Sequence, residues 1–105
     1  MAIGVRPRVT AALAVRAGRI VRAGSLVSVT GSVRPRKRRA LLIADRLTSK
    51  GSYRRIIKRS VRTRRGRITV SYRVKRAGGY RLRLGVDADS RNLSARSDPL
   101  FVTAR

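Results

Sequence analysis

Hydrophobic and polar residues alternate with a period of two along most of this chain, and no long stretch has helical periodicity. The clearest run covers residues 80–86, which divide into two alternating sets: Tyr80, Leu82, Leu84 and Val86 on one side, Arg81, Arg83 and Gly85 on the other. Residues 26–33 and 68–74 alternate in the same way. Each run predicts a strand with its apolar side in a core and its polar side in water.

Weaker signals complete the set of expected strands. The pattern favours strands at residues 9–15, 20–21, 53–57 and 100–104, with glycines marking the turns between runs. Residues 40–47 form the most apolar segment and are expected to be a central strand covered on both faces. Residues 34–39 are expected to form a basic loop. Gly66, inside the sequence Arg-Arg-Gly-Arg, is expected to give a tight turn a positive φ.

The number and spacing of these runs predict an all-β fold. We expect an immunoglobulin-like Greek-key sandwich of about seven antiparallel strands, with a closed barrel of the OB type as the structural alternative. The 105 residues suffice for one modest core. The whole chain, 1–105, is therefore interpreted as a single immunoglobulin-like domain with its core at about 9–104 and a flexible N-terminal arm at 1–8.

Four segments carry a resemblance to a known group of modules: residues 21–33, 64–73, 77–84 and 97–102. In this order they resemble the bacterial immunoglobulin-like or fibronectin type III-like β-sandwich modules of secreted and cell-surface proteins. The resemblance implies a structural or adhesive role as a spacer or stalk, with neighbouring domains of a longer chain as partners. It also implies a secreted or surface location, a cytoplasmic one being the alternative, and a Tyr80 hydroxyl bonded to nearby backbone as in a tyrosine corner.

The composition argues against an enzyme. The chain has no histidine, no cysteine and only four acidic residues, so the common triads and zinc sites are missing and no cofactor is expected. The segment 87–92 faintly resembles a calcium loop, but a solvated polar turn is the favoured interpretation. No apolar run is long enough to span a membrane.

Charge is the unusual feature of the composition. Lysine and arginine number 28 against four acids, which gives a net charge of +24 and favours polyanionic partners. Residues 67–74 and 80–86 are expected to be hairpin partners, which would bring like charges near each other across the strands unless an anion bridged them. The candidate polyanion contacts are Arg54, Arg55, Arg62, Arg64, Arg65, Arg67, Arg73, Arg81 and Arg83. The alternative interpretation is that arginine simply fills solvent-facing strand positions.

Three kinds of acidic polymer are candidates: nucleic acid, cell-wall polymer and acidic polysaccharide. A second functional hypothesis is therefore a small basic nucleic-acid-binding protein of ribosomal style. Of the few aromatic residues only Tyr53 is expected to be exposed, whereas Tyr72 and Tyr80 are expected in the core. Basic surfaces without stacking aromatics predict salt-sensitive, sequence-independent contact with phosphates.

Overall fold

The computed structural model describes residues 8–13, 20–34, 37–87 and 94–105, and these ranges contain strands but no helix. The nine strands are β1 (Arg8–Leu13), β2 (Ile20–Val21), β3 (Leu26–Arg34), β4 (Arg39–Leu47), β5 (Tyr53–Arg62), β6 (Arg67–Arg73), β7 (Gly78–Val86), β8 (Ala95–Arg96) and β9 (Leu100–Ala104). Arg8, expected in a flexible arm, already belongs to β1. The described ranges therefore contain no helix that is long and apolar enough to cross a membrane.

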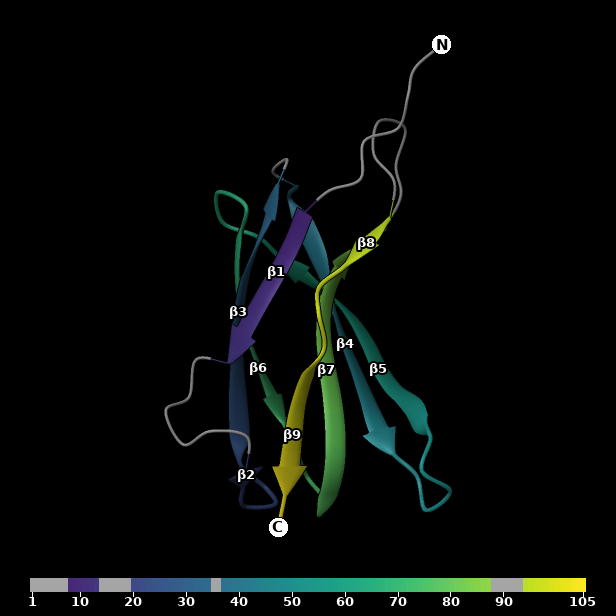
Figure 1. Cartoon of the computed structure of the whole chain (residues 1–105). Helices are drawn as coiled ribbons and strands as arrows, with labels where there is room; N and C mark the ends of the chain where they lie inside the picture. The colour runs from purple at the N-terminus through teal and green to yellow at the C-terminus, as the bar shows by residue number, and fades with distance from the viewer. Residues whose placement is uncertain (1–7, 14–19, 35–36, 88–93) are drawn as a thin grey trace.

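The strands form two sheets (Figure 1). One contains β1, β3 and β6 in that order, and the other runs β2-β9-β7-β4-β5, with β8 added to one end of β7. Neighbours are antiparallel except β2 and β9, which run parallel. The predicted all-β sandwich is confirmed, and the described strands do not close into a single barrel.

The core lies between the two sheets and is built from the alternating positions that the sequence marks. Val27, Val29 and Val33 of β3 are buried, as are Tyr80 and Leu82 of β7. Burying apolar surface contributes about 25 cal/mol per Å², so these short aliphatic side chains supply most of the stability. The predicted inward faces of residues 26–33 and 80–86 are thus confirmed.

Strand β4 is covered on both faces, as predicted for residues 40–47. Ala40, Leu42 and Ala44 belong to the core between the sheets. Ile43 and Asp45 point to the opposite face, yet they are 0% and 2% exposed. Side chains of the neighbouring strands must therefore cover the outer side of this sheet.

The expected hairpin between residues 67–74 and 80–86 is wrong. β6 pairs with β3 in one sheet, whereas β7 pairs with β4, β8 and β9 in the other. Alternation fixes which face a side chain takes but does not fix which strand lies beside it. Arg73 therefore does not share a sheet with Arg81 and Arg83.

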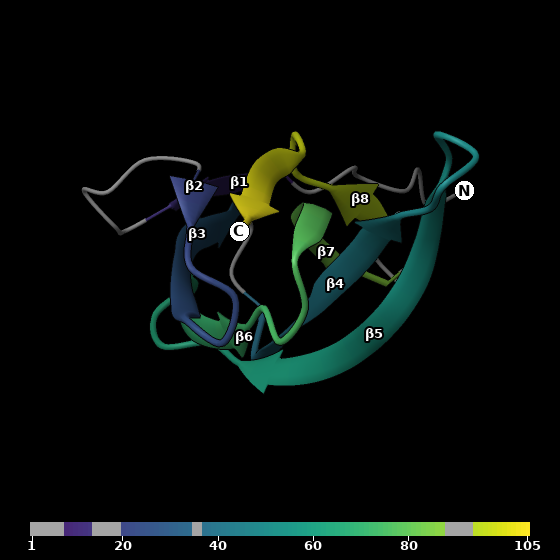
Figure 2. The ribbon, with the colours of Figure 1, turned by 90° about the horizontal axis from the view of Figure 1, so that it is seen from below.

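Two smaller boundaries also differ from expectation. β5 continues to Arg62 instead of ending near residue 57, and it curves strongly so that its C-terminal end approaches β6 (Figure 2). The predicted basic loop is shorter, because Arg34 ends β3 and Arg39 begins β4. The longer β5 brings more arginines into a sheet than the sequence pattern suggested.

The link between Arg76 and Tyr80 has the expected tyrosine-corner geometry. The Tyr80 hydroxyl donates a hydrogen bond to the Arg76 carbonyl at 2.7 Å and accepts one from the Arg76 amide at 3.2 Å. The ring is buried and packs edge-on to Tyr72. These contacts fix the approach of the chain to β7.

Candidate anion-binding surface

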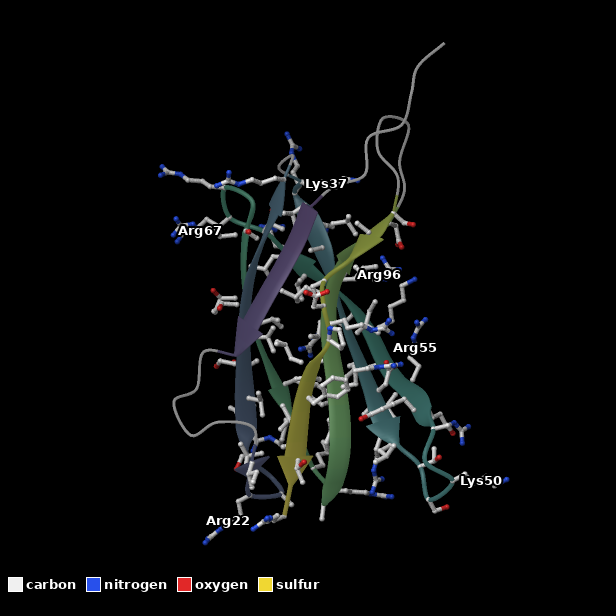
Figure 3. The ribbon with its side chains drawn as sticks, in the orientation of Figure 1. Arg22, Lys37, Lys50, Arg55, Arg67 and Arg96 are labelled. Atoms are coloured by element: carbon white, nitrogen blue, oxygen red, sulfur yellow. The ribbon has the colours of Figure 1, made fainter. Side chains whose placement is uncertain are left out.

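The nine arginines predicted to contact a polyanion are divided among separate parts of the structure. Arg54, Arg55 and Arg62 lie on β5; Arg64, Arg65 and Arg67 lie at the turn that leads into β6; Arg73 ends β6; Arg81 and Arg83 lie on β7. Figure 3 shows Arg55 and Arg67 on opposite sides of the ribbon. The set is therefore not one continuous face.

Arg81 and Arg83 are held by a carboxylate within the protein. Asp45 Oδ2 lies 2.8 Å from Arg81 Nη2, 2.9 Å from Arg81 Nε and 3.1 Å from Arg83 Nη2. Asp45 Oδ1 lies 4.0 Å from Arg55 Nε. We refer to Asp45, Arg55, Arg81 and Arg83 as the Asp45 cluster.

Sheet register explains why the Asp45 cluster forms. Asp45 stands directly opposite Arg81 on β7, and Ile43, two residues earlier, stands opposite Arg83. On the other side, a bulge between Ala44 and Asp45 shifts the register of β5 so that Arg55 faces Asp45. Such a bulge aims a side chain at a partner that regular pairing would miss.

Aromatic rings complete the surroundings of Arg81. Its guanidinium lies over the ring of Tyr53, 4.6 Å from the centroid, and that ring is 6.1 Å from the ring of Phe101. A cation over an aromatic face is stabilised electrostatically. Tyr53, expected to be exposed, is half-buried by these contacts. Arg81 is thus held by both a carboxylate and a ring.

Asp87 collects a second set of cations at the other end of β7. Asp87 Oδ1 lies 3.8 Å from Lys58 Nζ and 3.5 Å from Arg96 Nη2. Lys37 Nζ also donates a hydrogen bond to the Asp87 carbonyl at 3.2 Å. Asp87 begins the segment considered as a calcium loop, and residues 88–92 of that segment lie outside the described residues. In the described ranges, no three acidic side chains approach closely enough to hold a metal ion.

Five arginines line a depression of about 1310 Å³ at the end of the sandwich where β3 finishes and β6 begins. We call it the arginine pocket; its lining consists of Arg34, Arg62, Arg64, Arg65 and Arg67 with Ser32, Val33, Gly66 and Thr69. No acidic residue of the described ranges lines it. Among the residues that the structure describes, none of these five guanidinium groups has a hydrogen bond or an ion pair.

A tight turn gathers part of this pocket. The Arg64 amide donates to the Arg67 carbonyl at 2.8 Å, and the Arg67 amide donates back to the Arg64 carbonyl at 2.9 Å. Arg65 and Gly66 have φ values of 52° and 76°, which is the geometry of a two-residue type I′ turn. The positive φ predicted for Gly66 is confirmed, and Arg65 shares it.

Strand register adds repulsion at the same end, because Arg39 stands directly opposite Arg62. Like charges directly opposite each other destabilise a sheet. The repulsion expected between β6 and β7 therefore arises within the β4–β5 pair, both next to the arginine pocket and where Arg46 stands opposite Arg54.

The remaining candidates belong to neither group. Arg73 donates a hydrogen bond to the Gly24 carbonyl at 2.6 Å, which ties β6 to the turn before β3. Arg54 is exposed on β5.

Burial raises the pKa of the Tyr72 hydroxyl above its usual value. The nearby Tyr80 adds to the rise, and Arg59 opposes it.

The nine candidates missed two residues that define these groups. Arg34 was assigned to a loop, but it is part of the arginine pocket. Asp45, one of the four acidic residues, was given no role from the sequence, but it is the centre of a cluster. An acidic residue in the most apolar strand was the signal that could have revealed its role, since a buried carboxylate requires a partner.

Comparison with known proteins adds no relative. The chain matches no protein-family model, and a search of curated proteins finds no similar sequence. The arrangement of strands and charges in this structure is therefore the basis for assigning a function.

Proposed function

We propose that this chain is a non-catalytic, immunoglobulin-like structural module, a spacer or adhesion unit of an exported or surface protein that also contacts polyanions. The observation that carries the proposal is the position of the parallel pair β2–β9. Strand β1 pairs in one sheet, and β2, the next strand, pairs in the other. The chain thus contributes to both sheets before it enters β3.

The strand order supports the immunoglobulin-like assignment. In such domains one sheet contains strands A, B and E, and the other contains C, F and G, with C′ added in variable-type domains. The order β1-β3-β6 against β9-β7-β4-β5 corresponds to A-B-E against G-F-C-C′. The Tyr80 hydroxyl bond adds the corner typical of strand F.

The same geometry suits a module that carries tension. β1 starts at the end of the sandwich opposite to the one where β9 finishes (Figure 1). Because β2 and β9 run parallel, pulling Arg8 and Arg105 apart loads their hydrogen bonds in shear. Two hydrogen bonds would have to break together. The Ala23 amide donates to the Arg105 carbonyl at 2.8 Å, and the Arg105 amide donates to the Val21 carbonyl at 2.9 Å.

Single-molecule force spectroscopy tests this role. The chain has no cysteine, so attachment points introduced as cysteine are unique. We expect a higher unfolding force for handles at the two chain ends than for handles on Arg38→Cys and Arg64→Cys. The latter pair stands at the open end of the β4–β5 hairpin, where force peels one residue pair at a time. An equal or lower force between the chain ends would contradict a tension-bearing role.

The arginine pocket favours the second part of the proposal, contact with a polyanion. Five guanidinium groups, with no acidic residue beside them in the described lining, create a strong local positive potential. The same feature is what a small basic nucleic-acid-binding protein would need, so this remains the competing function. Low unfolding force together with tight nucleic-acid binding would favour that alternative.

A further inference from the structure

We infer that the arginine pocket is a binding site for the phosphate backbone of duplex nucleic acid, which it contacts without reading sequence. The inference deepens the polyanion contact of the proposed function by assigning it a location and a ligand class. It does not depend on the tension-bearing role. Three properties of the pocket support it: unpaired charge, a pre-formed turn and a lining without aromatic rings.

The first property is the density of unpaired charge. All five basic residues of the pocket are arginines, whose planar fork can bind a phosphate through two parallel hydrogen bonds. A DNA duplex carries about one negative charge per 1.7 Å of its axis, so several phosphates can lie within one such depression. Binding would also relieve the repulsion between Arg39 and Arg62.

The second property is a turn that is fixed before any ligand binds. The Val33 amide donates to the Gly66 carbonyl at 2.8 Å, which ties the turn to β3. Arg65, at the first central position, has a φ of 52°, a conformation in which asparagine, aspartate or glycine is preferred. Arginine there is less favourable for the fold than asparagine, but it places a further guanidinium at the pocket. Such a local cost is typical of functional positions.

The third property separates duplex from single-stranded ligands. Proteins that bind single strands combine basic grooves with aromatic side chains on which bases stack. None of the residues that line the pocket is aromatic. Tyr53 and Phe101 pack against each other in the sheet β9-β7-β4-β5, and Tyr72 and Tyr80 form a second pair. The pocket therefore offers guanidinium groups for a backbone but no aromatic ring on which exposed bases could stack.

The test compares two triple variants of equal charge. The pocket variant carries Arg62→Gln, Arg65→Asn and Arg67→Gln. The control carries Arg22→Gln, Lys50→Gln and Arg76→Gln, all exposed positions; Figure 3 shows Arg22 and Lys50 far from Arg67. Binding to a 20-base-pair DNA duplex is measured by fluorescence anisotropy over a range of salt concentrations, after circular dichroism has shown that both variants are folded.

We expect the pocket variant to lose at least about 10-fold in affinity near 0.1 M salt and the control less than about 3-fold. The slope of log K against log salt should become shallower by about 2 to 3 in the pocket variant only, since each phosphate contact contributes about 0.9. Equal losses in the two variants would overturn the inference while leaving non-specific polyanion contact intact. Tighter binding of single-stranded DNA, heparin or polygalacturonate than of the duplex at equal charge would overturn the ligand assignment.

Discussion

The Asp45 cluster and the arginine pocket bring arginines together in opposite ways. In the cluster, three arginines surround one carboxylate that is 2% exposed, and the nearest contact is 2.8 Å. In the pocket, five arginines line one depression, and the lining has no acidic side chain from the part of the chain that the structure describes. The first arrangement stabilises the sheet with the protein's own anion, whereas the second leaves its charge for an anion from outside.

This difference follows from where each group lies in the fold. Asp45 is on β4, between β5 and β7, so sheet register places partners on both sides of it. The pocket lies at strand ends and a turn, where side chains reach water and repulsion is screened. Four acidic residues cannot form ion pairs with all 28 lysines and arginines of this chain. Asp45, which is buried, lies at the centre of a sheet and pairs with the arginines beside it there.

Removing the carboxylate should have the largest effect. Asp45→Asn keeps one acceptor oxygen but removes the negative charge that Arg81 and Arg83 share, while both arginines remain partly buried. Breaking a fully buried pair costs about 3–5 kcal/mol, and since these arginines are partly exposed we expect about 2–4 kcal/mol here. Urea denaturation measures the loss, with the exposed Asp98→Asn as the control. A change in Asp45→Asn no larger than in the control would mean that the cluster does not stabilise the sheet.

Single arginines from the two groups should behave differently. Arg81→Gln removes the Nε hydrogen bond and the Nη2 ion pair to Asp45 as well as the contact with Tyr53, for an expected loss of about 1–2 kcal/mol. Arg67→Gln removes a charge without a partner among the described residues and should change the free energy of unfolding by less than about 0.5 kcal/mol. Equal losses in the two variants would remove the distinction between the groups.

A substitution in the turn of the arginine pocket should increase the free energy of unfolding instead of lowering it. Arg65→Asn replaces a residue at φ 52° with one that tolerates this conformation and also removes repulsion, so we expect about 0.5–1 kcal/mol of stabilisation. Thermal denaturation gives the shift, and Thr69→Asn, on the neighbouring strand, serves as a control. A destabilised Arg65→Asn would indicate that the arginine contributes to the fold instead of to binding.

Salt should give the smallest effect. Raising sodium chloride from 0.05 to 0.5 M shortens the screening length from about 14 Å to about 4 Å and weakens repulsion among exposed arginines. We expect wild type to gain about 0.3–0.5 kcal/mol in urea denaturation, and the pocket triple variant to gain less. A larger gain in the triple variant would show that the repulsion lies elsewhere.

Sequence alone predicted the faces of the strands better than their neighbours. Period-two alternation identified the buried sides of residues 26–33 and 80–86 because burial of one face imposes that period. It placed β6 beside β7, although the chain crosses to the other sheet between Arg73 and Gly78. The alternation of residues within one strand does not specify which sheet the next strand joins.

The prediction of functional residues was limited in the same way, because the sequence does not show which residues become neighbours across strands. The sequence predicted Arg62, Arg64, Arg65 and Arg67 as contacts because the residues are close along the chain. It grouped Arg81 and Arg83 with them, although both are bound to Asp45. Pairing across strands depends on register and on the bulge after Ala44, which only the folded sheet reveals.

Nuclear magnetic resonance of the arginine side chains tests the central claim most directly, because it reports each guanidinium separately during a titration. Adding a short DNA duplex should shift the Nε–Hε signals of Arg62, Arg64, Arg65 and Arg67 and leave those of Arg81 and Arg83 unchanged. Equal shifts in both groups, or shifts confined to Arg81 and Arg83, would contradict the division between internally paired and available arginines.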